Sequence, residues 1–290
     1  MKVLYTSDLH GEIHLYEELL EWVHALKSEV VALGGDLLPS FAPSRRYEDM
    51  IPNQQSFMDQ FLRPFFGKMV DTTVVQRIFV IPGNWDLAYP LLFRKPMERV
   101  VDLDRRAYRL ENGYEWIGYP FVPPTPFRPK DYEKRDDTDA PWPPQKNPSY
   151  VRSLDEPQQL VSVDPHVYLR QRETLQEDLD RLPWPISFRK TVCIMHSPPF
   201  GTALDLIYGD KRTGSRSIKA YIDRHHPLIT LHGHIHESPE LSGTYVEKVG
   251  ETICVNPGQG YWTEGKSRFL HAVTFELEDP AGTLRHTCLR

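Results

Sequence analysis

The sequence predicts an α/β fold in which helices cover a β-sheet core. Two observations lead to this prediction. In the N-terminal part, short apolar runs alternate with a segment that has helical spacing, and each run ends in a polar turn. In the last third, further apolar runs again end in polar turns. The length of 290 residues suits one large α/β unit, so we expect a single domain over 1–290.

The N-terminal elements follow in order along the chain. Residues 2–6 form a short apolar run that predicts a buried strand, and 30–33 and 78–81 predict two more. Between the first two, apolar residues recur at helical spacing from Glu12 to Leu26, which predicts an amphipathic helix. Residues 57–69 show a similar spacing before the third strand.

The middle of the chain has a different composition. Nine of its 26 prolines fall between Pro120 and Pro148, together with a dense run of charges from Arg128 to Asp139. Proline removes backbone donors and interrupts helices and central strands. We therefore predict an irregular surface insertion at about 120–165, either a lid or a disordered segment, whose charge run is a solvated face. Residues 166–182 return to a helical pattern.

The last third predicts a return to sheet, with strands at 191–195, 228–231, 246–249, 252–255 and 272–277. Two cysteines, Cys193 and Cys254, lie within these runs, and we interpret them as small core residues. The third, Cys288, is distant in sequence, so the cysteines form neither a zinc motif nor an even set of disulfides.

Composition excludes some classes of protein. With 40% hydrophobic and 26% charged residues, the chain reads as soluble and globular. No run approaches the roughly 18 apolar residues of a membrane span. A polar motif by Ser7 and Asp8 leaves no room for a signal peptide, so we expect a cytoplasmic location. The net charge of −6 disfavours a nucleic-acid partner but permits a small anionic substrate.

Polar side chains gather where five predicted strands end. The strand-end residues are Asp8, His10, Asp36, Asn84, His196, His234 and His236. Strand ends are where layered α/β folds bind ligands. Carboxylates, imidazoles and an amide suit borderline divalent ions, and a carboxylate such as Asp36 can bridge two of them. Two ions about 3.5–4 Å apart can hold a hydroxide and clamp phosphoryl oxygens for in-line attack.

These residues resemble the calcineurin-like metallophosphoesterase superfamily, whose motifs occur in the order D-x-H, GD, GNH[DE], a lone His and GHxH. The corresponding residues here are Asp8-Leu9-His10, Gly35-Asp36, Gly83-Asn84-Trp85-Asp86, His196 and Gly233-His234-Ile235-His236. The resemblance implies a four-layer α/β/β/α sandwich, with two mixed β-sheets flanked by helices. It also implies a dimetal centre that hydrolyses phosphoric esters.

By this resemblance, one metal would take Asp8, His10, Asp36 and His236, and the other Asp36, Asn84, His196 and His234. We expect Asp36, Asn84 and His234 to take part in catalysis. Two divalent ions are implied, with manganese our first expectation; the ligands also admit iron, zinc, cobalt or nickel.

Two positions depart from the family pattern. Trp85 replaces the histidine of GNH[DE], which is the family's proposed general acid, and Pro39 replaces the second Asp of GDxxD. An indole cannot supply a proton, and loss of an acid typically costs about 10²–10⁴-fold in rate. The loss in rate is smallest for a substrate with a good leaving group, so we favour a diester or pyrophosphate substrate over a monoester. The UDP-diacylglucosamine pyrophosphate hydrolases, a resembling branch, also lack this histidine and carry Arg.

The expected substrate is a small phosphorylated molecule, for which a nucleotide is one candidate. Trp85 is then either a packed aromatic or a substrate-binding surface on which a base stacks. Three other functions stay open: a phosphomonoesterase, a nuclease and a non-catalytic scaffold that binds protein on the same fold. Asp86 is either a turn residue or a partner that orients a ligand. Five other histidines are interpreted as structural or surface residues: His14, His24, His225, His226 and His232.

Overall fold

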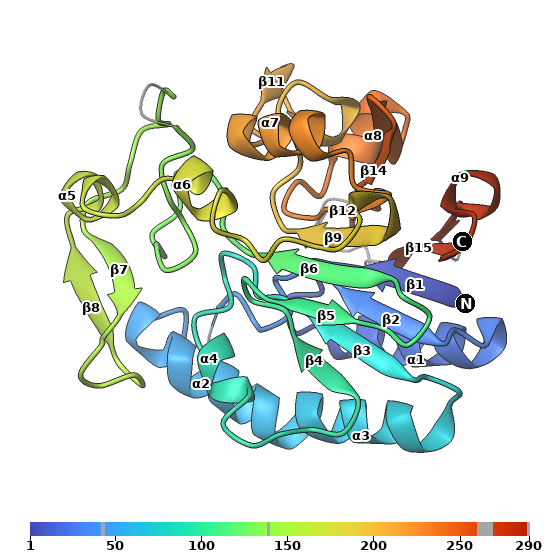
Figure 1. Cartoon of the computed structure of the whole chain (residues 1–290). Helices are drawn as coiled ribbons and strands as arrows, with labels where there is room; N and C mark the ends of the chain where they lie inside the picture. The colour runs from blue at the N-terminus through green and yellow to red at the C-terminus, as the bar shows by residue number, and fades with distance from the viewer. Residues whose placement is uncertain (42–43, 138–139, 260–268, 289–290) are drawn as a thin grey trace.

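The computed structural model describes the chain except residues 42–43, 138–139, 260–268 and 289–290. Two six-stranded mixed sheets pack face to face, and helices cover their outer faces (Figure 1). This arrangement confirms the four-layer α/β/β/α fold expected from the sequence. No helix in the described ranges is long and apolar enough to cross a membrane.

The first sheet is built around the N-terminal strand. Its strands, in spatial order, are β16 (Arg285–Cys288), β15 (His271–Glu276), β1 (Lys2–Thr6), β2 (Val30–Leu33), β3 (Arg77–Val80) and β4 (Val100–Asp102). Strands β1 to β4 are parallel, while β15 and β16 are antiparallel to their neighbours. The carboxyl ends of β1, β2 and β3 therefore share one edge of the sheet.

The second sheet repeats this arrangement with a parallel centre. Its strands, in spatial order, are β13 (Val246–Val249), β14 (Thr252–Val255), β12 (Ile229–Leu231), β9 (Thr191–Met195), β6 (Glu115–Tyr119) and β5 (Ala107–Arg109). The four inner strands are parallel and the two edge strands antiparallel. Strands β4, β5 and β6 were not predicted, although β6 is buried along its whole length.

Alternating side chains on each strand fill different apolar layers. On β1, Val3 and Tyr5 pack between the sheets, where the rings of Phe79 and Trp116 stack with centroids 4.5 Å apart. Leu4 points to the opposite face and packs in a layer under the helices. The helices beneath that face are α1 (Ile13–Leu26), α2 (Met50–Phe57) and α3 (Arg63–Thr72). The other sheet is covered by α6 (Leu175–Leu179) and α7 (Arg216–His225).

Helix boundaries differ from the sequence prediction at two places. The helical pattern at 57–69 belongs to α2 and α3, which are joined by a π-helical turn, Met58–Leu62. The pattern at 166–182 splits into α5 (Pro165–Arg170) and α6, because Thr174 and Glu177 form a capping box that begins a new helix. The remaining short elements are α4 (Tyr89–Leu92), α8 (Ser238–Ser242), α9 (Pro280–Thr283), β10 (Leu206–Ile207) and β11 (Lys211–Arg212).

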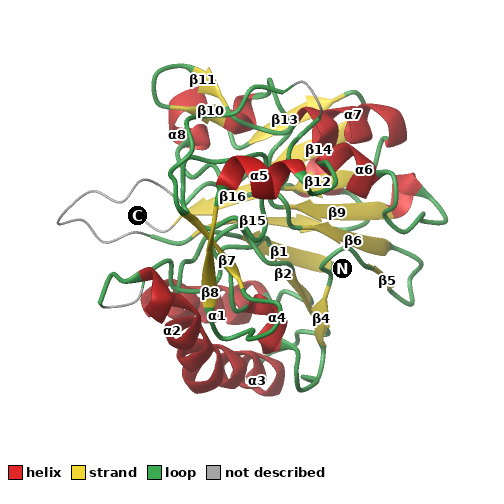
Figure 2. Cartoon of the chain, turned by 90° about the vertical axis from the view of Figure 1, so that its left-hand side faces the viewer, coloured by secondary structure: helices red, strands yellow, loops and turns green. Residues whose placement is uncertain are grey.

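The proline-rich insertion contains regular structure. It carries the antiparallel hairpin of β7 (Ser149–Arg152) and β8 (Leu160–Val163), followed by α5. These elements lie beside the carboxyl-terminal ends of the central strands (Figures 1 and 2). The rings of Tyr47 and Tyr150 stack with centroids 4.9 Å apart, which fastens the hairpin to the segment before α2.

The expectation that the charge run is a solvated face is wrong. The side chains of Lys130 and Glu133 are fully buried and pair at 2.8 Å. Lys134 pairs with Asp178 at 2.6 Å, also out of solvent. The carboxylate of Asp136 accepts hydrogen bonds at the start of α7. These charges are buried because each finds an opposite charge or backbone donors in the folded chain.

Candidate metal centre

The loops that follow β1 and β2 run side by side and hold the first candidate ligands. The backbone N–H of Asp8 donates to the carbonyl of Gly35 at 2.8 Å, and that of His10 donates to the carbonyl of Asp36 at 2.8 Å. These bonds continue the pairing of the parallel strands past their ends. Three predicted ligands are thereby placed on adjacent turns at one edge of the sheet.

Four predicted ligands have left-handed backbone conformations. Their φ angles are 59° at Asp8, 48° at His10, 52° at Asp36 and 67° at His234. Such angles are uncommon for residues other than glycine, and strain of this kind concentrates at functional sites. Here each sharp bend takes the side chain out of the regular pleat. This is how an Asp-x-His or His-x-His pair can direct two side chains toward one point.

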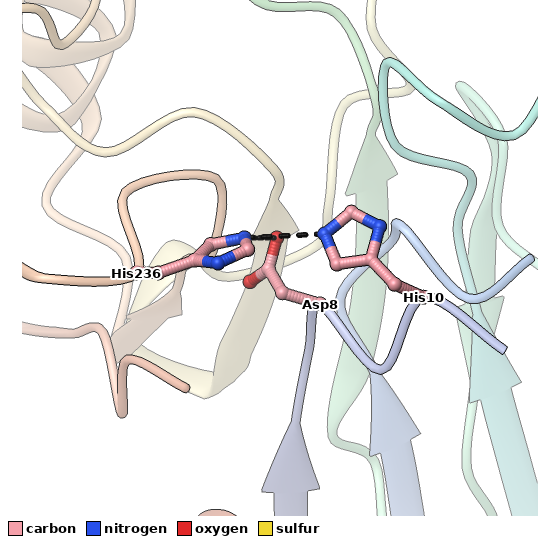
Figure 3. A group of neighbouring side chains, drawn as sticks. All are labelled: Asp8, His10 and His236. Atoms are coloured by element: carbon pink, nitrogen blue, oxygen red, sulfur yellow. Dashed lines mark hydrogen bonds and ion pairs between the residues drawn. The ribbon is translucent and has the colours of Figure 1, made fainter. Parts of the chain in front are cut away.

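One group of candidate ligands consists of Asp8, His10 and His236 (Figure 3). The Nε2 atoms of the two imidazoles lie 3.2 Å apart, and Nε2 of His236 lies 3.4 Å from Oδ1 of Asp8. The residues come from opposite sheets, since His10 follows β1 and His236 follows β12. Three donor atoms that converge in this way provide part of a coordination sphere.

A second group consists of Asp8, Asp36 and His196. Nε2 of His196 lies 3.6 Å from Oδ2 of Asp36 and 3.3 Å from Oδ1 of Asn84. Its Nδ1 lies 2.7 Å from the carbonyl of Gly34, which orients the ring with Nε2 toward the cluster. Oδ2 of Asp36 is also 3.8 Å from Nε2 of His10, so this carboxylate lies between the two groups.

The last predicted ligand joins the same cluster. The backbone N–H of His234 donates to Oδ1 of Asp8 at 3.0 Å, and its ring centroid lies 5.3 Å from that of His196. The structure therefore places all seven predicted ligands in one region. Among the described residues, the two groups of converging donor atoms contain Asp8, His10, Asp36, His196 and His236, and His234 lies beside them. Desolvation of its partly buried imidazole and the positive charge of His196 lower the pKa of His234 to about 3.

The electrostatics of the cluster suit bound cations. Burial opposes protonation of His196, but the carboxylates of Asp36 and Asp8 raise its pKa to about 9. Burial likewise opposes ionisation of Asp8, yet the surrounding histidines hold its pKa far below the usual range. Two buried carboxylates thus need positive charge around them. With imidazole and amide donors alongside, these residues fit divalent metal ions.

A family model described as calcineurin-like phosphoesterase matches residues 1–238. The chain belongs to this family. The converging carboxylates and imidazoles are therefore candidate metal ligands of a phosphoesterase. No curated protein matches the chain.

Three solved structures share the fold. One is 18% identical, with a TM-score of 0.61 over all of this chain and 99% of the other. The protein TT1561 of Thermus thermophilus is 17% identical, with a TM-score of 0.53 over 100% and 99% of the two chains. A dimetal phosphatase from Danio rerio is 10% identical, with a TM-score of 0.50 over 94% and 92%.

Asp86, the last residue of the GNH[DE] block in this calcineurin-like phosphoesterase, ties two ligand loops together. Its carboxylate accepts hydrogen bonds from the backbone N–H groups of Gly83 at 2.9 Å, Leu38 at 2.8 Å and Leu37 at 3.0 Å. The loop that carries Asp36 is thereby fixed against the loop that carries Asn84. Of the two interpretations of Asp86, the structure favours a positioning role.

Two supporting residues were missed in the sequence. Oγ of Ser40 lies 2.6 Å from Nδ1 of His10, the ring nitrogen opposite the one that faces the cluster. The buried amide of Asn256 donates to the carbonyls of Gly233 at 3.3 Å and Ile235 at 3.0 Å, which flank His234. Asn256 follows β14 at its carboxyl end, so its place after a predicted strand was the available signal.

The five histidines interpreted as structural or surface residues lie outside the ligand groups. His232 is buried, and its Nδ1 lies 2.9 Å from the carbonyls of Met195 and Ser197, a structural role. His14 and His24 are exposed on α1. His225 ends α7, and His226 is its left-handed cap.

Trp85 has the backbone position of the family histidine but a packed side chain. It is 8% exposed and lies between Phe41 and Phe127, with ring centroids at 5.1 and 5.4 Å. Its carbonyl accepts a hydrogen bond from the amide of Gln54 at 2.6 Å. The side chain that replaces the proton donor is thus part of an aromatic cluster.

Proposed function

We propose that this chain is a dimetal phosphoesterase that hydrolyses a phosphodiester or pyrophosphate bond. The observation that carries the proposal is Trp85, placed directly after Asn84 and beside two groups of converging candidate ligands. When bound, the two metal ions would supply Lewis acidity and ionised water at neutral pH. The seven predicted ligands would hold them, with Asp36 shared.

The chain's own groups divide the remaining work. Besides holding metal, Asn84 and His234 would contact the phosphoryl group, and Asp36 would hold both ions. The carbonyl of Gly34 and the hydroxyl of Ser40 keep the rings of His196 and His10 in their orientations. Gly34 and Ser40 would therefore affect the reaction by orienting metal ligands, and neither would exchange a proton with the substrate.

The missing acid narrows the substrate. A simple alkoxide needs a proton as it leaves, and the indole of Trp85 cannot give one. A nucleotide or pyrophosphate leaving group departs as a stable anion, so its hydrolysis is slowed least when the general acid is absent. A small nucleotide-like substrate, manganese as the ion and a cytoplasmic location remain our predictions. A phosphomonoesterase is the alternative activity, and a protein-binding scaffold is disfavoured because no predicted ligand is missing.

The test combines metal content with a substrate panel. Protein loaded with Mn²⁺ should contain two ions per chain and hydrolyse bis(4-nitrophenyl) phosphate at least tenfold faster than phenyl phosphate, in kcat/KM, because phenolate is the leaving group that needs a proton. Asp36→Asn should lose activity and metal, while His14→Ala, an exposed control on α1, should keep both. Activity that is indifferent to Asp36→Asn, or protein without stoichiometric metal, would overturn the proposal.

A further inference from the structure

We propose that Phe41, Trp85 and Phe127 form an aromatic subsite that binds a flat ring of the substrate beside the metal centre. The proposal rests on the proposed function, because the ring belongs to an ester whose phosphorus lies at the candidate ligands. We call these three residues the aromatic wall. The indole of Trp85 contacts both other rings, with centroids 5.1 Å from Phe41 and 5.4 Å from Phe127.

The three residues of the aromatic wall differ in their exposure to solvent. Trp85 is 8% exposed, whereas Phe41 and Phe127 are 51% and 42% exposed. Single exposed phenylalanines are ordinary. Here two exposed phenylalanines contact the same packed indole, so that exposed aromatic area gathers at one place, as is typical of binding sites. The exposed outer rings, more than the central indole, therefore offer the contact area.

The aromatic wall is joined to the candidate ligands through two loops. Phe41 directly follows Ser40, whose hydroxyl lies 2.6 Å from Nδ1 of His10. Trp85 directly follows Asn84, and its backbone N–H donates to Oδ1 of Asp36 at 2.8 Å. A substrate whose phosphoryl group lies at these ligands would extend an ester group toward the wall.

The third ring comes from the insertion. Phe127 lies near its start, on a turn held by the buried carboxylate of Glu133, which accepts hydrogen bonds from the backbone and hydroxyl of Thr125. The buried ammonium of Lys130 bonds both Glu133 and the carbonyl of Thr125 at 2.8 Å. This buried pair fixes the turn, and the insertion contributes one side of the subsite.

The surface chemistry selects the occupant. Among its three members there is no charge and only one polar hydrogen, so hydrogen-bond readout is minor and flat apolar area dominates. A phenyl ring or nucleobase stacks on such a surface, whereas a methyl or sugar group gains little. One stack is worth about 1–3 kcal/mol, which corresponds to roughly fivefold to 150-fold in affinity.

The kinetic test keeps the leaving group constant. Phenyl 4-nitrophenyl phosphate and methyl 4-nitrophenyl phosphate release the same 4-nitrophenolate, so their ratio of kcat/KM reports the retained ester group. The Mn²⁺-loaded wild type should prefer the phenyl ester at least tenfold. Phe41→Ala with Phe127→Ala should reduce this preference to below threefold and change the methyl ester less than twofold. The exposed Trp184→Leu control should behave as wild type.

A binding measurement separates this proposal from the proposed function. Diphenylphosphinate and dimethylphosphinate have P–C bonds that cannot be hydrolysed, and calorimetry gives their Kd values on metal-loaded protein. A diphenyl preference that disappears in the double variant supports the aromatic wall even if no ester is hydrolysed. Equal loss on both ligands, or an unchanged preference in folded Phe41→Leu and Phe127→Leu variants, would show that these rings only pack the insertion against the loop of Trp85.

Discussion

The backbone N–H of Trp85 donates a hydrogen bond to Oδ1 of Asp36 at 2.8 Å. The residue that replaces the family histidine therefore also helps to orient the carboxylate that lies between the two ligand groups. Because the donor is a main-chain group, this bond does not depend on the side chain at position 85. The side chain can change the chemistry while the backbone keeps the centre in place.

Trp85→His should therefore introduce a proton donor without displacing Asp36. General acids typically contribute about 10²–10⁴-fold, so even a poorly placed imidazole should raise kcat/KM for phenyl phosphate at least tenfold. The control is Trp85→Phe, which keeps an aromatic ring and supplies no proton. An equal gain in Trp85→Phe, or a wild type that already prefers monoesters, would contradict the proposed meaning of Trp85.

Gly83→Ala tests how tightly the ligand loops are packed. A Cβ at Gly83 would lie 2.2 Å from Oδ1 and 2.3 Å from the backbone nitrogen of Asp36. Neither atom can move away without breaking the cluster, so we expect at least a tenfold loss of Mn²⁺ affinity by calorimetry. Gly67→Ala is the matched control, because a Cβ there meets nothing within 4 Å. On α3 it should stabilise the chain by about 0.5–1 kcal/mol. Equal metal affinity in both variants would refute the packing argument.

The proximity of the seven predicted ligands follows from the sequence because each comes after an apolar run, and parallel strands end at a common edge. The burial of the charge run does not. Lys134 finds Asp178 44 residues away, and Asp136 reaches Ser215, 79 residues away. The local sequence does not indicate such distant partners, so a dense run of charges predicts a solvent-exposed segment. Strand β6 was also not predicted. It ends at Tyr119, directly before the proline-rich stretch that begins at Pro120 and was interpreted as irregular.

Asn256→Ala should weaken the GHxH loop. The amide donates to the carbonyls of Leu204, Gly233 and Ile235 and to the hydroxyl of Ser238, all in the buried interior. Leaving buried acceptors unpaired costs about 1–3 kcal/mol, and the loop that carries His234 loses its anchor.

We expect a lower Tm together with less than two bound metal ions per chain, measured by thermal melts and elemental analysis. The exposed Asn112→Ala serves as the control and should change neither. A variant that loses stability but retains both ions at full affinity would limit Asn256 to a structural role.

Glu133 should make stability depend on pH between about 4.5 and 7. Burial raises the pKa of this carboxyl from 4.5 to about 7, although Lys130 partly opposes the shift. Because the folded chain binds the proton more tightly than the unfolded chain, the stabilisation is fully present below pH 4.5. It is lost as the pH rises through about 7.

Glu133→Gln fixes the neutral form and should remove this dependence. Relative to wild type, its free energy of unfolding should rise by about 1–3 kcal/mol between pH 5 and pH 8, measured by urea denaturation at each pH. Glu48→Gln, at a side chain that is 68% exposed, should track wild type throughout. A constant difference between Glu133→Gln and wild type across this range would mean that Glu133 stays ionised in its pair with Lys130. The insertion would then be held by a permanent buried ion pair, and its stability would not respond to mild acid.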